Sequence, residues 1–217
     1  MYTVGTAADA QRALADEADG LVVQGVEAGG HLVGVEPVER ALAAVREVAG
    51  EAPLLAAGGV AEAGDLRRLI AAGAEAAVAG TRFLLTEESR AHREYQRRVL
   101  GAPGTLCTFL FGFGWPMRHR VVPNAATERW CRDSELGPAW VRRLGELSAP
   151  LGRALPLNVL RAMVAVQRPV LPLFYPALPL EGMPASSVDR AALYAGATAQ
   201  RIDDVIPAAE AVARLAP

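Results

Sequence analysis

The sequence contains no lysine, and all 22 of its basic residues are arginine. This absence excludes Schiff-base catalysis and a lysine general base. An excess of positive charge is also missing, because 24 acidic residues leave a net charge of -2. Proteins that hold phosphodiester backbones need a positive surface. Nucleic acid is therefore not expected as a partner.

Cysteine is scarce, with only Cys107 and Cys131. They form no C-x-x-C pair and are too few for a disulfide framework or a zinc site. The three histidines lie far apart in the chain and form no H-x-x-x-H motif, so no metal site is expected. So few thiols fit a reducing compartment. The N-terminus lacks the basic region and the apolar region of an export signal, so a cytoplasmic location is expected.

Long apolar segments are nearly absent as well. The longest uncharged run, Val99–Met117, reaches membrane-spanning length but is interrupted by four glycines and two prolines. Such breakers argue against a spanning helix, so no membrane association is expected. The composition, 52% hydrophobic and 21% charged over 217 residues, is that of a folded chain with ample material for a core.

Through residue 100 the chain repeats a short apolar run, a glycine-rich turn and an amphipathic stretch. This pattern predicts an α/β fold of βα units around a parallel sheet that is buried on both faces. The expected strands are Tyr2–Val4, Gly20–Gln24, Pro53–Ala57 and Ala76–Ala79. The expected helices are Ala7–Glu17, Pro37–Ala49, Glu62–Ala72 and Glu87–Leu100.

After residue 100 this rhythm stops. Helices are expected around Pro138–Leu147, over Leu157–Gln167 and from about Ala199 or Asp203 to Leu215, with an extended proline-rich connector between the last two. No strand series continues the sheet. We therefore expect two parts, the βα units over residues 1–100 and a mostly helical region over residues 101–217.

Three unusual turns follow successive apolar strands, at Gln24–His31, Ala57–Val60 and Ala79–Arg82. Ligands of parallel α/β folds lie at the C-terminal ends of strands, and glycine lets backbone amides approach a ligand closely. Gly58-Gly59 and Gly80-Thr81 each precede an expected helix. Their N–H groups and the two helix ends are therefore predicted to converge on one phosphate dianion.

His31 is the candidate catalytic group, because a neutral imidazole at a strand end can take a proton from a carbon acid. The alternative is a loop histidine that only binds backbone. Glu27 is expected to anchor its loop through backbone N–H groups, and His92 and His119 are expected to be solvated or structural.

All three tryptophans lie in the second half of the chain, at Trp115, Trp130 and Trp140. They could wall a pocket, but sealing the second part onto the sheet is the favoured interpretation, because aromatics dominate ordinary burial. Arg118 and Arg120 could bind an anion, although arginines near loops are more often solvated or paired with acids.

Seven segments share a characteristic order and spacing: Asp19–His31, Leu54–Val60, Gly73–Leu84, Thr86–His92, Arg120–Asn124, Leu193–Gly196 and Ile202–Glu210. Taken together, these segments resemble the nitronate monooxygenase family, formerly called 2-nitropropane dioxygenases. Their order and spacing make the resemblance specific. It covers nearly the whole chain and is firmest over residues 19–95.

The resemblance implies an FMN-dependent TIM barrel that oxidises nitronates or nitroalkanes with dioxygen. It implies that residues 1–100 form a part of this barrel and that residues 101–217 form a mostly helical substrate-side or capping region. It implies that His31 is the general base for the substrate's α-proton, and that dioxygen reoxidises the reduced flavin. It also implies a set of cofactor-binding residues: Gln24 and Gly29 near the flavin and ribityl chain, and Gly58, Gly59, Val78, Ala79, Gly80 and Thr81 around the phosphate.

The chain departs from this family in two respects. A TIM barrel has eight strand–helix units, whereas four are visible here and Met1 falls where the fifth strand would begin. We expect a chain without the first half of the barrel, with activity impaired by that truncation and with two exposed sheet edges. Self-association, or a partner chain that completes the barrel, would cover those edges. The second departure is Leu32-Val33-Gly34, where the family has a shorter step.

Two other functions stay open. Flavin-dependent enoyl-thioester reductases have a similar Glu-Ala-Gly-Gly-His loop, and NAD(P)H-driven reduction of an enoyl thioester would identify one. A non-catalytic flavin-binding remnant would bind the cofactor without turnover. The retention of His31 and both glycine turns argues against long decay, and the missing half-barrel argues for it.

Overall fold

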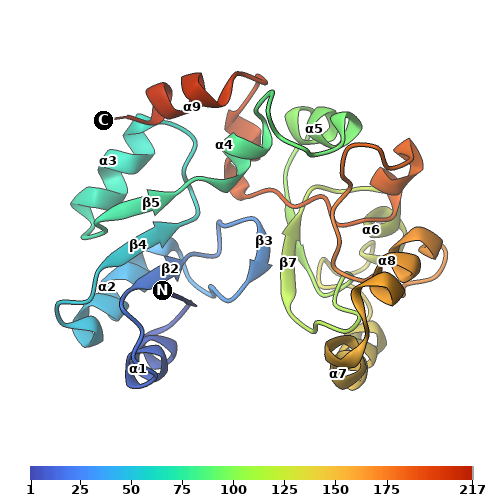
Figure 1. Ribbon diagram of the computed structural model, residues 1–217, viewed down its shortest axis with the longest axis horizontal. Coiled ribbons are helices and arrows are strands. Elements are labelled where there is room, and N and C mark those ends of the chain that lie inside the picture. Colours follow the sequence, from blue (N-terminus) through green and yellow to red (C-terminus); the bar gives the residue numbers. More distant parts are fainter. Residues whose placement is uncertain (217) are drawn as a thin grey trace. The chain divides into compact units, whose positions relative to one another are not determined.

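Figure 1 shows the computed structural model of the chain, which describes residues 1–216. The chain divides into two compact units, one formed by residues 1–89 with the segment from Gly196 onward, the other by residues 90–195. This division differs from the expected boundary at residue 100. The helix that ends at Leu100 belongs to the second unit, and the end of the chain returns to the first.

The first unit contains a parallel four-stranded sheet in the order β1-β2-β4-β5. Its strands are β1 (Tyr2–Val4), β2 (Leu21–Gln24), β4 (Leu54–Ala57) and β5 (Ala76–Val78). The connecting helices are α1 (Ala7–Ala15), α2 (Val38–Ala49) and α3 (Ala63–Ala71). These elements agree with the expected ones to within two residues at each end, and they confirm the α/β fold with strand–helix units of TIM-barrel type.

One face of this sheet makes the core of the unit. Val23 and Ala56, in register with each other, are fully buried against helix residues such as Leu42. The expected burial of both faces is wrong, since Val22 and Leu55 on the opposite face are only half-buried. Strand side chains alternate between faces, so an apolar strand alone does not show that both faces are covered.

Four shorter elements complete the first unit: β3 (Gly30–Leu32), α4 (Gly80–Leu84), the 3-10 helix η2 (Ala197–Arg201) and α9 (Ala208–Leu215). The helix expected over Glu87–Leu100 is wrong in its first half. Residues 86 and 87 instead pair with the backbone of Ile206, and helix α5 (Arg93–Leu100) begins only after His92.

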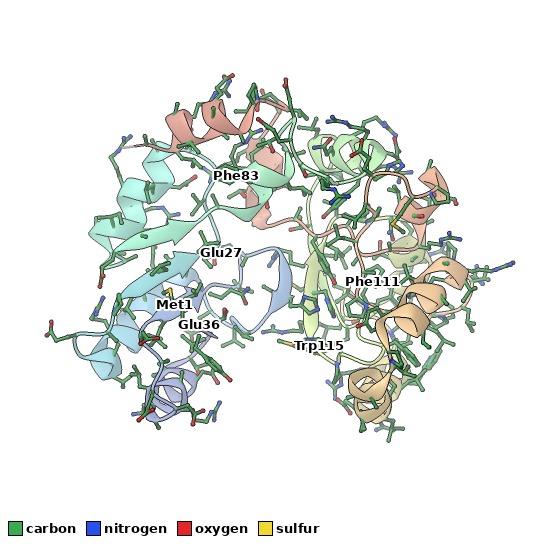
Figure 2. The ribbon with its side chains drawn as sticks, in the orientation of Figure 1. Met1, Glu27, Glu36, Phe83, Phe111 and Trp115 are labelled. Atoms are coloured by element: carbon green, nitrogen blue, oxygen red, sulfur yellow. The ribbon has the colours of Figure 1, made fainter. Side chains whose placement is uncertain are left out.

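The second unit contains α5, α6 (Ala125–Trp130), α7 (Ala139–Ala154), α8 (Leu157–Val166) and the 3-10 helix η1 (Ala185–Asp189). It also holds two strands that the sequence did not predict, β6 (Leu106–Thr108) and β7 (Arg118–Val121), paired antiparallel. Their core includes the fully buried Phe111, labelled in Figure 2, packed against Phe174. No helix within residues 1–216 is long and apolar enough to cross a membrane.

The tryptophans pack within this second unit. Trp130 meets Trp140 edge to face, with ring centroids 6.0 Å apart, and its Nε1 donates to the carbonyl of Pro169 at 2.7 Å. Trp115 and Trp140 each keep about half of their surface exposed, at 46% and 52%. Trp130 therefore contributes to the packing of α6 and α7.

Candidate functional site

The three glycine turns leave the sheet at the same edge. The register pairs Gln24 with Ala57 and Ala57 with Val78, so the residues that follow β2, β4 and β5 emerge side by side. In parallel α/β folds this edge is where ligands bind. The structure thus brings together the turns that the sequence singled out.

Gln24 organises the turn that carries His31. Its Nε2 donates to the carbonyl of His31 at 3.0 Å, and its Oε1 accepts the N–H of Val33 at 2.8 Å. These bonds fix the backbone on both sides of Leu32. Glutamine can do this because its amide both donates and accepts. His31 itself lies in the short strand β3 and not in the loop that the sequence indicated.

The His31 side chain is half-buried, and its burial lowers the pKa of the imidazole below its ordinary value. Desolvation disfavours the charged form of histidine. The imidazole is therefore neutral at pH 7, which is the state that can accept a proton.

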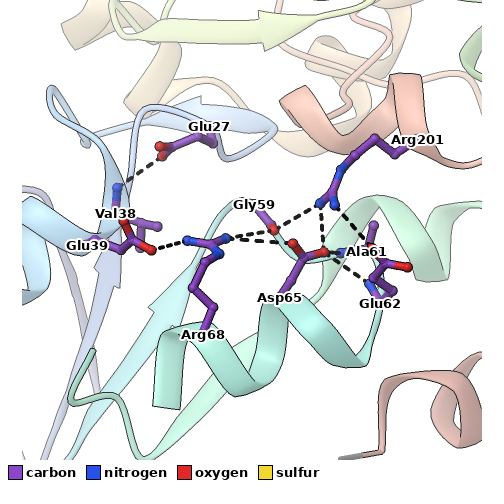
Figure 3. Close-up of polar contacts among 9 residues, drawn as sticks. All are labelled: Glu27, Val38, Glu39, Gly59, Ala61, Glu62, Asp65, Arg68 and Arg201. Atoms are coloured by element: carbon purple, nitrogen blue, oxygen red, sulfur yellow. Dashed lines mark hydrogen bonds and ion pairs between the residues drawn. The ribbon is translucent and has the colours of Figure 1, made fainter. Parts of the chain in front are cut away.

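Glu27, labelled in Figure 2, anchors the loop after β2. Its carboxylate accepts the N–H of Val38 at 3.1 Å, at the start of α2 (Figure 3). Its backbone carbonyl accepts the N–H of Ala197 at 2.9 Å. The expectation that Glu27 anchors its loop is confirmed.

Gly58 and Gly59 both have positive φ, at 115° and 76°. A Cβ on Gly58 would lie 2.9 Å from the N of Ala28, so only glycine lets the β4 turn approach the β2 loop this closely. In contrast, a Cβ on Gly80 would meet no atom within 4 Å. Gly80 therefore borders open space.

One part of the predicted phosphate site is not available. The carboxylate of Asp65 accepts the N–H groups of Ala61 and Glu62, at 2.8 Å and 3.2 Å, as part of a capping box at the start of α3. A negative charge already lies at this helix end, so the end of α3 does not face a dianion as expected. The donors that remain are in the turn itself, where the N–H groups of Gly59 and Val60 have no acceptor within residues 1–216.

The remaining residues of the predicted phosphate site lie at the end of β5 and the start of α4. Val78 ends β5 with 43% of its surface exposed, and Ala79 immediately precedes α4. Thr81, in the first turn of α4, is buried, and its Oγ1 accepts the N–H of Gly196 at 2.9 Å. Its hydroxyl hydrogen stays free to rotate toward another acceptor.

Residues 196–204, which we call the C-terminal strap, bind all three turns. Besides the bonds of Gly196 to Thr81 and of Ala197 to Glu27, Arg201 lies 3.4 Å from the carbonyl oxygen of Gly59 and donates to Asp65 at 2.7 Å. The backbone at Gly196 runs so close to the β2 loop that a Cβ would lie 2.8 Å from the carbonyl oxygen of Glu27 and 3.3 Å from the N of Gly29. The strap thus lies against Gly29, which stays half-buried.

A buried arginine fixes the far end of the strap. Arg82 is only 4% exposed and donates to the carboxylate of Asp204 at 2.6 Å and to its carbonyl at 2.8 Å. Sequence reasoning missed this pair, and it missed Arg201 and Asp65. The partners stand 122 and 136 residues apart, so no local period connects them.

Asp65 is ionised in this arrangement. Burial opposes its ionisation, but hydrogen bonds from Arg201 and from the N–H groups of Ala61 and Glu62 outweigh burial and hold the pKa of the carboxyl below its ordinary value. The cluster around the β4 turn is therefore charged on both sides, with carboxylates and guanidinium groups interleaved (Figure 3).

The other histidines and the arginine pair have structural contacts in the second unit. The Nδ1 of His92 accepts the N–H of Glu94 at 3.1 Å and caps α5. His119 is fully buried beside Tyr194, whose hydroxyl lies 3.2 Å from its Nδ1. Arg120 donates to the hydroxyl of Thr105 at 2.9 Å. The structural interpretation of both histidines is confirmed.

The sequence of this chain is similar to one family of known proteins over its whole length. The sequence profile described as "Nitronate monooxygenase" matches residues 1–217. A nitronate monooxygenase of Metarhizium robertsii is 33% identical over 169 residues, which are 70% of this chain and 46% of that protein.

Two solved structures share the fold of this chain. The nitroalkane oxidase of Streptomyces ansochromogenes superposes with a TM-score of 0.68 at 28% identity, covering 98% of this chain and 55% of that chain. FabK of Thermotoga maritima superposes with a TM-score of 0.67 at 21% identity, covering 98% of this chain and 58% of that chain. The chain thus spans about half the length of the proteins it matches.

Proposed function

Because this chain belongs to the nitronate monooxygenase family, we propose that it contributes the cofactor cradle and the general base of an enzyme that oxidises nitronates or nitroalkanes with dioxygen. The observation that carries this proposal is the side-by-side exit of three glycine turns from one sheet edge, with a neutral histidine in the first of them. A base at a ligand-binding edge fits chemistry that begins with proton removal from carbon.

In this proposal His31 removes the α-proton of the nitroalkane. Its half-burial keeps the imidazole neutral, and the Gln24 amide fixes the backbone that follows it. In this proposal Gln24 has two roles. Its side chain holds the loop that carries His31, and it also lies near the bound flavin. Positioned bases of this kind contribute about 10²–10⁴-fold to a rate.

We propose FMN as the cofactor. The residues present fit its phosphate, since the N–H groups of Gly59 and Val60 lack an acceptor within the described residues and Gly80 borders open space. Val78, Ala79 and Thr81 would complete this cradle, and Gly29 would lie along the ribityl chain. When bound, the flavin would take up the electrons of the substrate and pass them to dioxygen.

The proposed enzyme is cytoplasmic and needs more chain than these residues supply. Within the described residues β1 and β5 are the two outer strands of the sheet, and each offers an unpaired edge. Such edges are templates for pairing with another strand. We propose that a second copy or a partner chain covers them.

The first experiment is a visible absorption spectrum of the purified chain after FMN is added and washed out. A retained flavin band, followed by oxygen uptake that depends on a nitroalkane or its nitronate, is the expected result. His31→Gln should keep the band and lose the oxygen uptake. His92→Gln, which changes a helix cap in the second unit, is the matched control and should keep both.

Other outcomes separate the alternatives. Full activity of His31→Gln would show that another group is the base. A retained flavin without any turnover would favour a binding remnant. NAD(P)H-driven reduction of an enoyl thioester would favour the reductase function, for which the likeness to FabK supports the fold alone.

A further inference from the structure

The carbonyl oxygen of Gly59 lies between two guanidinium groups (Figure 3). The Nη2 of Arg201 is 3.4 Å from this oxygen and the Nη2 of Arg68 is 3.5 Å from it. These contacts are long for hydrogen bonds, but each brings a full positive charge to the negative end of a carbonyl dipole. Both arginines therefore favour the same orientation of the Gly59–Val60 peptide.

Carboxylates hold both arginines in place. Arg201 donates to Asp65 at 2.7 Å and lies 3.5 Å from Glu62. Arg68 donates to Glu39 and also lies 3.7 Å from Asp65, which thus contacts both guanidinium groups. Because Asp65 is 7% exposed and is itself fixed at the start of α3, the pair of cations has a rigid support.

The orientation of this peptide decides what faces the cradle. In a planar trans peptide the N–H points opposite to the C=O. With the Gly59 carbonyl turned toward the arginines, the N–H of Val60 points away from them, and it has no acceptor within residues 1–216. The reversed peptide would instead present a carbonyl oxygen, which repels an anion.

The two glycines before this peptide leave it weakly held on one side. Gly58 and Gly59 both lie at positive φ, and their backbone torsions can change with little steric cost. Reversal would also change the φ of Val60, which is not positive, and a β-branched side chain opposes a positive φ. The charged groups around Gly59 therefore add to the constraint that Val60 imposes from the other side.

We propose that Arg201 and Arg68 are positioning residues that orient the Gly59–Val60 peptide so that its N–H binds the phosphate of the cofactor. This inference rests on the proposed function and adds the residues that select a phosphorylated flavin. It requires no direct contact of either arginine with the phosphate. The selectivity for FMN over riboflavin is the property that these two residues control.

The test compares the dissociation constants of FMN and riboflavin, measured by quenching of flavin fluorescence. Arg201→Ala should weaken FMN binding about tenfold, the value of one hydrogen bond to a charged group, and leave riboflavin unchanged. Arg68→Ala should act in the same direction. The control is Arg46→Ala, because Arg46 also donates to backbone carbonyls, those of Gly50, Ala52 and Gly73, but at the opposite ends of the strands.

An unchanged ratio of the two constants in Arg201→Ala would overturn the proposal. Arg201→Lys decides between positioning and simple attraction, because lysine keeps the charge and loses the planar fork that reaches two partners. Weak FMN binding by the lysine variant supports positioning, and full recovery overturns it.

A titration with inorganic phosphate tests the same peptide without a flavin. The amide signals of Gly59 and Val60 should shift in the NMR spectrum of the wild-type chain, and the shift should be lost in Arg201→Ala. Absence of a shift in the wild type would overturn the inference. A chain that binds phosphate in this way but retains no flavin would refute the proposed function and support the inference.

Discussion

The hydroxyl oxygen of Thr81 accepts the N–H of Gly196 at 2.9 Å, although 115 residues separate the two in the chain. The contact joins the first turn of α4 to the C-terminal strap. The sequence predicts that the turn containing Thr81 binds the cofactor. The contact gives this turn a second role, because it also holds the strap.

Thr81→Val should therefore loosen the strap. The variant keeps the shape of the side chain but removes the acceptor, leaving the buried N–H of Gly196 without its partner. We expect a loss of about 1–3 kcal/mol in the free energy of unfolding, measured by chemical denaturation. Thr81→Ser keeps the hydroxyl and should stay within about 1 kcal/mol of the wild type. Equal stability of the valine and serine variants would contradict this role.

Gly58→Ala should destabilise the chain more than an alanine elsewhere. The new Cβ would combine a φ of 115° with a 2.9 Å approach to the N of Ala28. We expect a cost of about 1–3 kcal/mol, with weakened flavin binding. Gly64→Ala is the matched control, because Gly64 lies in α3 with no atom within 4 Å of its Cβ position and should gain roughly 0.5–1 kcal/mol. A neutral Gly58→Ala would show that the turn adapts.

The pKa of His31 predicts an acid limb in the pH profile of activity. Burial places the folded pKa below the ordinary value of 6.5, so the midpoint of the acid limb should lie below pH 6.5. The same shift affects stability. Below pH 6.5 the unfolded chain binds more protons than the folded one, so the free energy of unfolding decreases with further acidification.

His31→Gln should remove this component. Denaturation of the variant measured between pH 7 and pH 5 should show a smaller decrease in stability than that of the wild type. An identical decrease in both proteins would show that His31 has the same pKa in the folded and unfolded states.

The outer strands predict self-association. Tyr2 is 56% exposed on β1 and Val78 is 43% exposed on β5, and both strands offer unpaired backbone groups. Light scattering of the isolated chain should detect dimers or larger species. Tyr2→Lys and Val78→Lys should reduce association, because charged side chains on an edge disfavour further pairing. A wild-type chain that stays monomeric would contradict the prediction.

The sequence predicted the sheet well because each strand–helix unit is a local pattern. An apolar run such as Leu54–Ala57 and the amphipathic helix after it carry their own signals, and parallel order follows from the alternation. The helix boundary at Arg93 was missed because pairing of residues 86 and 87 with Ile206 overrides the local preference for helix.

The candidate site was predictable only in part for a related reason. A glycine-rich turn after an apolar strand is a local signal in the sequence, so Gly58, Gly59 and Gly80 could be named in advance. Arg201 and Arg82 could not, because their partners are far away in sequence and their own neighbourhoods look like ordinary polar surface. The strand that contains His31 was also missed, since it is only three residues long and begins with a glycine, so it carries no alternating pattern of its own.

The return of the C-terminal strap to the first unit constrains the order of events during synthesis. Residues 90–195 are synthesised before Asp204, so the intervening unit can begin to become compact while Arg82 still lacks its carboxylate. Until the strap has emerged from the ribosome, Arg82 lacks its carboxylate partner and the hydroxyl of Thr81 lacks the N–H of Gly196. Nascent chains stalled before residue 196 should therefore be cut readily by protease near Arg82, and full-length chains should resist it.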